Sequence, residues 1–175
     1  NRAPSQGEID WFINDLLSQG VSRNLVLNNF IFSAEYRAFI EGIFGASTPR
    51  PENTLVNDFY RGILSRLPET GGFNYWLDQM RAAQCMGAQA VRDLSHQIAL
   101  GFINSNEYLA LGRTNVQFVE DMYDAILRRG ASPAEVNYWL GLLSTGTRGQ
   151  VLEGFTASDE FQTRVPAVLD AGCLW

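Results

Sequence analysis

The chain has 175 residues, of which 46% are hydrophobic and 18% are charged, so it can bury a core and is not expected to stay disordered. Its net charge of -6 disfavours nucleic acid as a partner, because an acidic surface repels phosphate groups. No apolar run approaches the roughly 20 residues that a membrane-spanning helix needs, so the sequence predicts no membrane insertion.

The first part of the chain, residues 1–45, has the pattern of an incomplete helical unit. A capping box of the form Ser-x-x-Glu at residues 5–8 predicts the start of a helix, and the aromatic pair Trp11-Phe12 follows. Further on, Phe30 to Tyr36 follow the order Phe-x-x-Ser-x-Glu-aromatic. Because the chain starts without Met and without a signal peptide, we expect it to continue a longer gene product.

The second part, residues 52–112, predicts a complete unit. Between Leu55 and Leu67 the apolar residues recur at helical spacing, and Pro68 is expected to end this opening helix. A second helix carries Asn-Tyr-Trp-Leu at residues 74–77, and Phe102 begins a second Phe-x-x-Ser-x-Glu-aromatic segment. This order of features defines the unit that the rest of the chain can be compared with.

The third part, residues 115–164, repeats the second. Its opening helix is expected from Asn115 to Arg129, with Gly130 as a left-handed cap, and its Asn-Tyr-Trp-Leu segment lies 63 residues after the first one. Its Phe-x-x-Ser-x-Glu-aromatic segment starts at Phe155, only 53 residues after Phe102. The second unit therefore contains about ten extra residues in its middle.

These patterns predict an all-α fold of about three tandem diverged units, each of three to four short helices, followed by a tail at residues 165–175. The first unit lacks its opening helix. We expect the Tyr-Trp pairs to lie mainly in the cores, and the serines of the last segment to cap a short helix with a glutamate in its first turn. The repeat signature consists of Tyr60, Arg66, Tyr75, Trp76, Phe102, Ser105, Glu107, Tyr123, Arg129, Tyr138, Trp139, Phe155, Ser158 and Glu160.

This signature resembles a bacterial helical domain of unknown function that is distantly related to the phycobilisome linker domain. The resemblance covers Leu55 to Arg164 well and Arg2 to Phe39 in part. The family often has Gly before the arginine of the opening helix, where this chain has Ser65 and Arg128. The resemblance implies a fold and a habit of association within large secreted, surface-layer-like and calcium-repeat proteins, and it supplies no catalytic residues.

The two cysteines, Cys85 and Cys173, do not have the spacing of a zinc site. Two unpaired buried thiols and one disulfide are both compatible with the sequence. The export that the resemblance implies favours the disulfide, which would hold the tail against the third unit together with Val168, Leu169, Leu174 and Trp175. A bond requires the two Cα atoms to lie within about 7 Å.

The residue types of common catalytic sites are sparse. His96 is the only histidine, and its helical neighbours Asp93 and Gln97 predict a surface patch and not a nucleophile system. The adjacent acids Glu120-Asp121 and Asp159-Glu160 are expected on a solvated acidic face. The sequence has no phosphate-binding loop, dinucleotide-binding motif or EF-hand, so we expect no catalytic residue, no metal site and no cofactor.

One basic position recurs: Arg66 and Arg129 end the opening helices, and Arg2 stands at the matching place before the first unit. A structural interpretation has each arginine link the helix end to backbone carbonyls or to a carboxylate. A functional interpretation makes the position a repeated contact for an anionic group, such as an acidic glycan.

The expected function is a non-catalytic structural or protein-interaction module, for scaffolding or assembly, of a bacterial secreted or cell-surface protein. Its partner would be another protein or a second copy of the chain. One alternative is a carbohydrate-binding module that uses exposed aromatic side chains. Another is an assembly protein of the phycobilisome-linker type, which the acidic charge disfavours. An enzyme would need a deep pocket lined by carboxyl groups with shifted pKa values.

Overall fold

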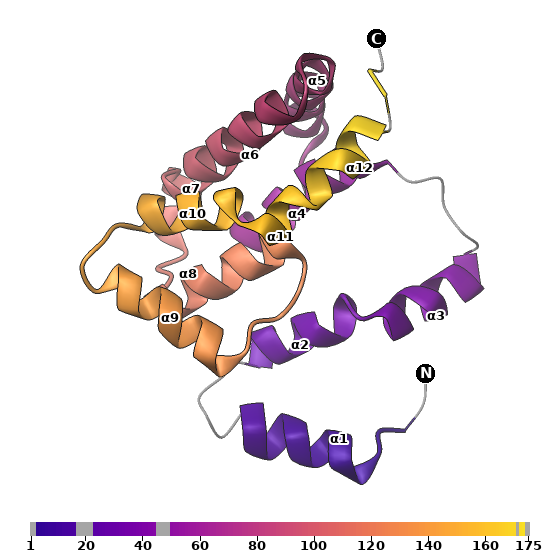
Figure 1. Cartoon of the computed structure of the whole chain (residues 1–175), viewed down its shortest axis with the longest axis vertical. Helices are drawn as coiled ribbons and strands as arrows, with labels where there is room; N and C mark the ends of the chain where they lie inside the picture. The colour runs from indigo at the N-terminus through magenta and orange to yellow at the C-terminus, as the bar shows by residue number, and fades with distance from the viewer. Residues whose placement is uncertain (1–2, 17–22, 45–49, 171, 174–175) are drawn as a thin grey trace.

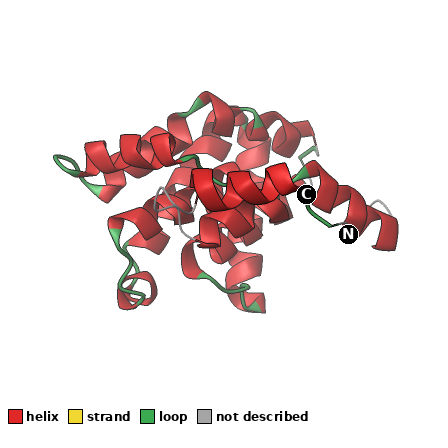
Figure 2. Ribbon diagram, turned by 90° about the horizontal axis from the view of Figure 1, so that it is seen from below, coloured by secondary structure: helices red, strands yellow, loops and turns green. Residues whose placement is uncertain are grey.

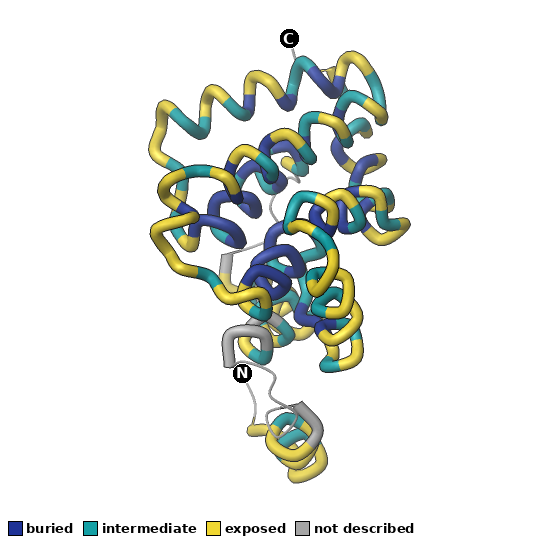
Figure 3. The backbone as a smooth tube through the Cα atoms, turned by 90° about the vertical axis from the view of Figure 1, so that its left-hand side faces the viewer, coloured by how far each residue is buried: buried dark blue, intermediate teal, exposed yellow. Residues whose placement is uncertain are grey.

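The structure is a computed structural model that describes residues 3–16, 23–44, 50–170 and 172–173 (Figure 1). Every regular element in these ranges is a helix, which confirms the all-α prediction (Figure 2). Within the described part of the chain, no helix is long and apolar enough to cross a membrane. Burial is uneven: none of the described side chains of residues 3–44 is fully buried, whereas the rest of the chain has a continuous core (Figure 3).

The first unit consists of α1 (Gln6–Asp10), which continues as the π-helix η1 (Trp11–Leu16), then α2 (Arg23–Ile31) and α3 (Ala34–Phe44). The expected capping box is present: the Ser5 hydroxyl accepts from the Glu8 amide, and the Glu8 carboxylate accepts from the Ser5 amide at 2.7 Å. Figure 1 shows α1 at the edge of the molecule, with α2 between it and the other helices.

The second and third units follow with the same order of elements. The second comprises α4 (Pro51–Leu64), α5 (Thr70–Met86), α6 (Ala88–Ile103) and α7 (Asn106–Ala110). The third comprises α8 (Asn115–Met122) with the π-helix η3 (Tyr123–Leu127), then α9 (Pro133–Leu143), α10 (Arg148–Ala157) and α11 (Asp159–Gln162). A last helix, α12 (Arg164–Asp170), begins the tail.

The opening helices end earlier than predicted, and by another device. Neither Pro68 nor Gly130 ends them. Instead Ser65 and Arg128, which occupy equivalent positions, adopt left-handed conformations with φ of 56° and 55°. A left-handed residue after the last turn closes a helix without needing proline. The position where the resembled family often has Gly is thus one where glycine has no steric cost.

The extra residues of the second unit lengthen two helices. α5 has 17 residues where α9 has 11, and α6 has 16 where α10 has 10. At 1.5 Å per residue, six residues add about 9 Å to each helix. In Figure 1 the pair α5 and α6 extends past the rest of the molecule, next to α12.

The tail is held against this longer helix pair. The structure joins Cys85, near the end of α5, to Cys173 in a disulfide with a Cα separation of 4.9 Å. The buried Gln84 side chain donates to the backbone carbonyl of Val168 at 2.6 Å, and Val165 and Val168 are buried. The expected contributions of Leu174 and Trp175 lie outside the described residues. The lengthened α5 thus supplies both the covalent and the polar anchor of the tail.

The two opening helices pack on each other at the centre of the core, α4 against η3. Gly62 and Ala125, which are equivalent in the repeat, lie directly opposite: a Cβ on Gly62 would come within 2.6 Å of the Ala125 backbone. The opening helices of the second and third units therefore meet at equivalent positions.

Two equivalent aspartates lie at this interface, and both are buried. Asp58 of α4 accepts from Arg164 at 2.6 Å, and Arg128 lies 3.2 Å away. Asp121 of α8 accepts from the Tyr108 hydroxyl at 2.8 Å and forms an ion pair with Arg113 at 3.1 Å. Each aspartate thus has an arginine that follows the short helix of the other unit.

The expectation of a solvated acidic face at Glu120-Asp121 is therefore wrong. Both side chains are buried at the contact between the units, where packing and not local sequence pattern decides exposure. Burial raises the pKa of Asp121 from its ordinary 3.8 to about 7, although the Tyr108 hydrogen bond and Arg113 oppose this shift. The same cause raises the pKa of Asp58.

We predict that Gly62→Ala destabilises the protein by about 1–3 kcal/mol, because the new methyl group overlaps the Ala125 backbone. Gly101→Ala in α6 is the matched control. It has no neighbour within 4 Å and should gain up to about 1 kcal/mol from helix propensity. Urea unfolding of both variants measures the difference. Equal stability of the two variants would show that the opening helices do not meet at Gly62.

We also predict that Asp121 makes stability depend on pH. A raised native pKa means that the folded state binds more protons than the unfolded state between about pH 4 and pH 7. The contribution of Asp121 is therefore present at low pH and is lost as pH rises through this window. The free energy of unfolding of the wild type, measured relative to that of Asp121→Asn, should fall from pH 4 to pH 7. A constant or rising difference contradicts the assignment.

Candidate functional site

The most elaborate polar cluster of the third unit is centred on Arg129. Its guanidinium donates to Glu135 and to Glu160 at 2.8 Å each, and to the backbone carbonyl of Gly130 at 3.0 Å. The same group lies over the Tyr123 ring, 4.9 Å from its centroid. One arginine thus connects the end of the opening helix with the first turns of α9 and α11.

The second unit builds the same cluster around Arg66. The guanidinium donates to Glu107 at 3.0 Å, to Glu69 at 2.7 Å and to the backbone carbonyl of Leu67 at 3.1 Å. It lies 5.1 Å from the centroid of the Tyr60 ring. The two signature arginines therefore have the same kinds of partner, and Arg129 makes one more bond, from its second terminal nitrogen to Glu135.

In both units one carboxylate of the cluster comes from the start of the second helix, but from a different position in each. In the third unit it comes from Glu135, the third residue of the helix and part of a capping box with Ser132. In the second unit it comes from Glu69, the N-cap residue, and the position equivalent to Glu135 is Gly72. A Cβ on Gly72 would meet the Glu69 carboxylate, so the glycine provides the space in which Glu69 replaces the missing glutamate.

The aromatic signature residues form the apolar side of each cluster. Tyr123 and Phe155 meet edge to face at 5.0 Å, and Tyr60 and Phe102 do so at 4.8 Å. Trp139 stacks on Phe155 at 4.2 Å and donates its indole N–H to the Tyr123 hydroxyl at 3.1 Å.

The serines and glutamates of the last segment lie where the sequence predicts them. Ser105 accepts from the Tyr108 amide at 3.1 Å, and Ser158 accepts from the Phe161 amide at 3.2 Å. Ser33 makes the same bond to the Tyr36 amide at 3.0 Å. All three serines are therefore N-caps, and the following glutamates lie in the first turns.

The expectation that both members of each Tyr-Trp pair lie in the core is half wrong. Trp76 and Trp139 are half-buried and pack against the core, but Tyr75 and Tyr138 are 57% and 62% exposed. Neighbouring residues on a helix point about 100° apart, so one narrow buried stripe accommodates only one of them. The tyrosines lie edge to face on the tryptophans beside them.

The electrostatics support a structural role for the signature arginines. Hydrogen bonds to Glu107 raise the pKa of Arg66, and the same bonds lower the pKa of Glu107. Hydrogen bonds to Glu160 likewise raise the pKa of Arg129. Both guanidinium groups are occupied by two carboxylates of their own unit, which leaves a repeated contact to an acidic glycan poorly supported. Arg2 lies outside the described residues.

His96 has an ordinary structural environment. Its Nδ1 lies 3.1 Å from the Thr156 hydroxyl, and the ring is half-buried between α6 and α10. The polar cleft around it has a volume of about 510 Å³, and a second cleft, beside Asp121, has a volume of about 390 Å³. The Asp121 carboxylate is already bound by Tyr108 and Arg113. The described residues bring together no three His, Cys, Asp or Glu side chains that could hold a metal ion.

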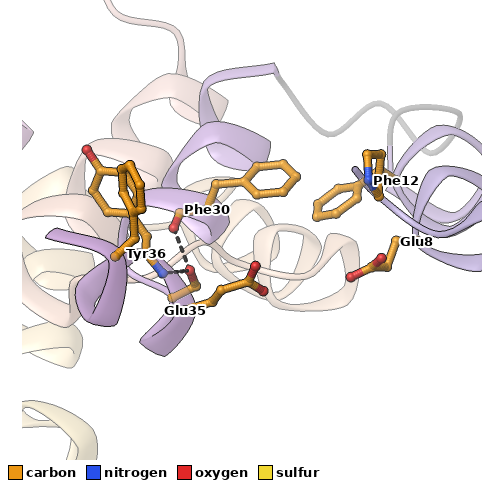
Figure 4. A pocket seen from close by; sticks show the side chains of 8 residues that line it. Glu8, Phe12, Phe30, Glu35 and Tyr36 are labelled. Atoms are coloured by element: carbon orange, nitrogen blue, oxygen red, sulfur yellow. Dashed lines mark hydrogen bonds between the residues drawn. The ribbon is translucent and has the colours of Figure 1, made fainter. Parts of the chain in front are cut away.

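The first unit contains the equivalents of some residues of this cluster. Phe12 and Phe30 stack at 4.5 Å with an interplanar angle of 24°, close to the 4.2 Å and 20° of Trp139 and Phe155. Beside them lies an apolar cleft of about 400 Å³ (Figure 4). In Figure 4 the two rings point toward each other, and the carboxylates of Glu8 and Glu35 lie along one side of the cleft.

The sequence patterns did not predict this cleft, although they marked several of the residues that line it. Its lining residues are Pro4, Glu8, Phe12, Phe30, Ser33, Glu35, Tyr36 and Phe39. Phe12, Phe30, Ser33 and Glu35 are the first-unit equivalents of signature residues in the third unit. Their places in the repeat pattern are the sequence signal that could have indicated them.

We predict that Trp139→Ala destabilises the protein by about 3 kcal/mol, at the low end of the range for a large aromatic because the side chain is half-buried. The neighbouring Tyr138→Ala is the matched control and should cost under about 1 kcal/mol. Urea titration of both variants gives the comparison. A loss below about 1 kcal/mol for Trp139→Ala would make the tryptophan a surface residue.

Comparison with known proteins finds a match for one part of the chain. No curated protein and no solved structure matches the chain. Residues 99–165 match the family model described as Domain of unknown function (DUF4214). This range begins near the end of α6 and runs through the third unit into α12. The match confirms that a domain of unknown function lies in this part of the chain.

Proposed function

We propose that the protein is a non-catalytic structural or protein-interaction module of a bacterial secreted or cell-surface protein. The observation that carries the proposal is that one aromatic position is exposed in the first unit and buried in the other two. Phe30 is 51% exposed in the first unit, whereas Phe102 and Phe155 are 8% and 0% exposed. Exposed aromatic clusters of this kind are typical of surfaces that bind another macromolecule.

The use of the polar groups supports the same proposal. The signature arginines and glutamates bind one another, and the buried aspartates hold the two larger units together. Such networks keep helices in place and leave few groups for chemistry on a substrate. The repeat therefore supports a framework whose outer faces serve for contact.

The disulfide supports the proposed location outside the cytoplasm. Disulfides persist in oxidising surroundings and are rare where thiols are kept reduced. The bond between Cys85 and Cys173 joins the lengthened α5 to the tail, so it has a structural purpose in this fold. Export would explain why the tail is anchored covalently.

A specific observation favours carbohydrate binding as the second candidate. Tyr75 and Tyr138 are exposed at equivalent positions, each beside a tryptophan. Each unit thus offers one exposed, flat aromatic face on which a sugar ring can stack. An assembly role like that of phycobilisome linkers has less support, because the chain carries a net charge of -6 whereas such linkers tend to be basic.

The test of the leading proposal is the location and redox state of the natural protein. Antibody detection in medium, envelope and cytoplasmic fractions of the source cells should find it outside the cytoplasm, with no thiol titratable before reduction. A cytoplasmic protein with two free thiols would contradict the proposal. In the same preparation, a loss of polysaccharide binding in Tyr75→Ala and Tyr138→Ala would favour the carbohydrate alternative.

A further inference from the structure

The polar cleft of about 510 Å³ beside His96 lies between α6 and α10, and none of its lining residues belongs to the arginine clusters. The two helices pack side by side (Figure 1). They run antiparallel, because His96 meets Thr156 while a Cβ on Gly149 would lie 3.7 Å from the Leu100 side chain. The cleft is therefore lined by two helices whose relative register is fixed.

The hydrogen bonds of Thr156 determine which nitrogen of His96 carries the proton. The Thr156 hydroxyl lies 3.1 Å from the carbonyl oxygen of Leu152 and 3.2 Å from that of Glu153, and a carbonyl can only accept. Because the single hydroxyl hydrogen is used there, the contact of 3.1 Å with His96 requires Nδ1 to donate. The neutral ring then presents Nε2 as an acceptor.

Other acceptors without a partner line the same cleft. The Glu153 carboxylate forms no hydrogen bond or ion pair with another described residue. One oxygen of Asp93 accepts from Gln89 at 2.7 Å, which leaves its second oxygen available. Gln162 donates its amide to the Thr156 carbonyl at 3.1 Å, which leaves its side-chain oxygen available. A ligand that satisfies this cleft must therefore supply hydrogen-bond donors.

The two carboxylates lie on opposite sides of the contact between His96 and Thr156. Asp93 comes three residues before His96 on α6, and Glu153 comes three residues before Thr156 on the antiparallel α10. At 1.5 Å per residue, the two acidic positions are about 9 Å apart along the helix axes. Arg92, the one cation among the lining residues, donates within its own helix. The cleft thus has one negative group at each end and an acceptor between them.

We propose that this cleft binds a linear aliphatic polyamine such as spermidine. One terminal ammonium group lies at Asp93, the other lies at Glu153, and the central nitrogen donates to Nε2 of His96. A neutral polyol would supply the donors but not the two charges. The inference goes beyond the proposed interaction function, and it can fail without affecting that function, whose test is location and redox state.

The experiment is a calorimetric titration of spermidine into the full chain at low salt, and it should show saturable one-to-one binding. Asp93→Asn and Glu153→Gln should each weaken binding about tenfold, because each removes a charge-assisted hydrogen bond. The matched control is Asp78→Asn, which removes the same charge from an exposed position of α5 outside the cleft and should leave binding unchanged. Butylamine, which has one ammonium group, should bind at least about tenfold more weakly than spermidine.

Nuclear magnetic resonance gives an independent measurement at the site. His96 is the only histidine of the chain, so the ring proton and nitrogen signals report on it alone. The free protein should show the tautomer with the proton on Nδ1, and spermidine should shift the Nε2 signal with the Kd found by calorimetry. The inference is overturned by an absence of binding, by equal weakening in Asp78→Asn, by a proton on Nε2 in the free protein, or by binding that leaves the His96 signals unchanged.

Discussion

The arginine at the end of each opening helix is the contact on which the second and third units depend. Arg66 and Arg129 each bind two carboxylates that lie at the first turns of two other helices, and each lies over a tyrosine of its own helix. Carboxylates at helix N-termini are already favoured by the helix dipole. The bidentate guanidinium adds geometry, so three helices are fixed relative to one another.

The packing of one opening helix on the other then joins the two units. Gly62 permits the close approach of the two helices. The charges of the buried Asp58 and Asp121 are compensated by arginines from the opposite unit. An uncompensated buried carboxylate would be costly, so these pairs also select which unit faces which. Among the described residues, no helix covers the aromatic side chains Phe30 and Tyr36 of the first unit in this way, and they are partly exposed.

Sequence periodicity was sufficient for the helical class, the capping serines and the alignment of the signature. It failed at three kinds of position. Left-handed closure at Ser65 and Arg128 involves residues that rarely adopt it, so Pro68 and Gly130 seemed the natural ends. The exposure of Tyr138 depends on whether Tyr138 or its neighbour Trp139 occupies the buried stripe of the helix. The burial of Asp121 depends on a partner unit that no local pattern specifies.

The most direct measurement of this account is native-state hydrogen exchange at three equivalent amides, those of Tyr36, Tyr108 and Phe161. Each donates to a capping serine at 3.0–3.2 Å, so the capping hydrogen bonds are alike, whereas Tyr36 is exposed and Tyr108 and Phe161 are buried. The account predicts that Tyr108 and Phe161 exchange only on global unfolding, and that Tyr36 exchanges by local opening with protection at least about a hundredfold lower. Equal protection at all three amides would contradict it.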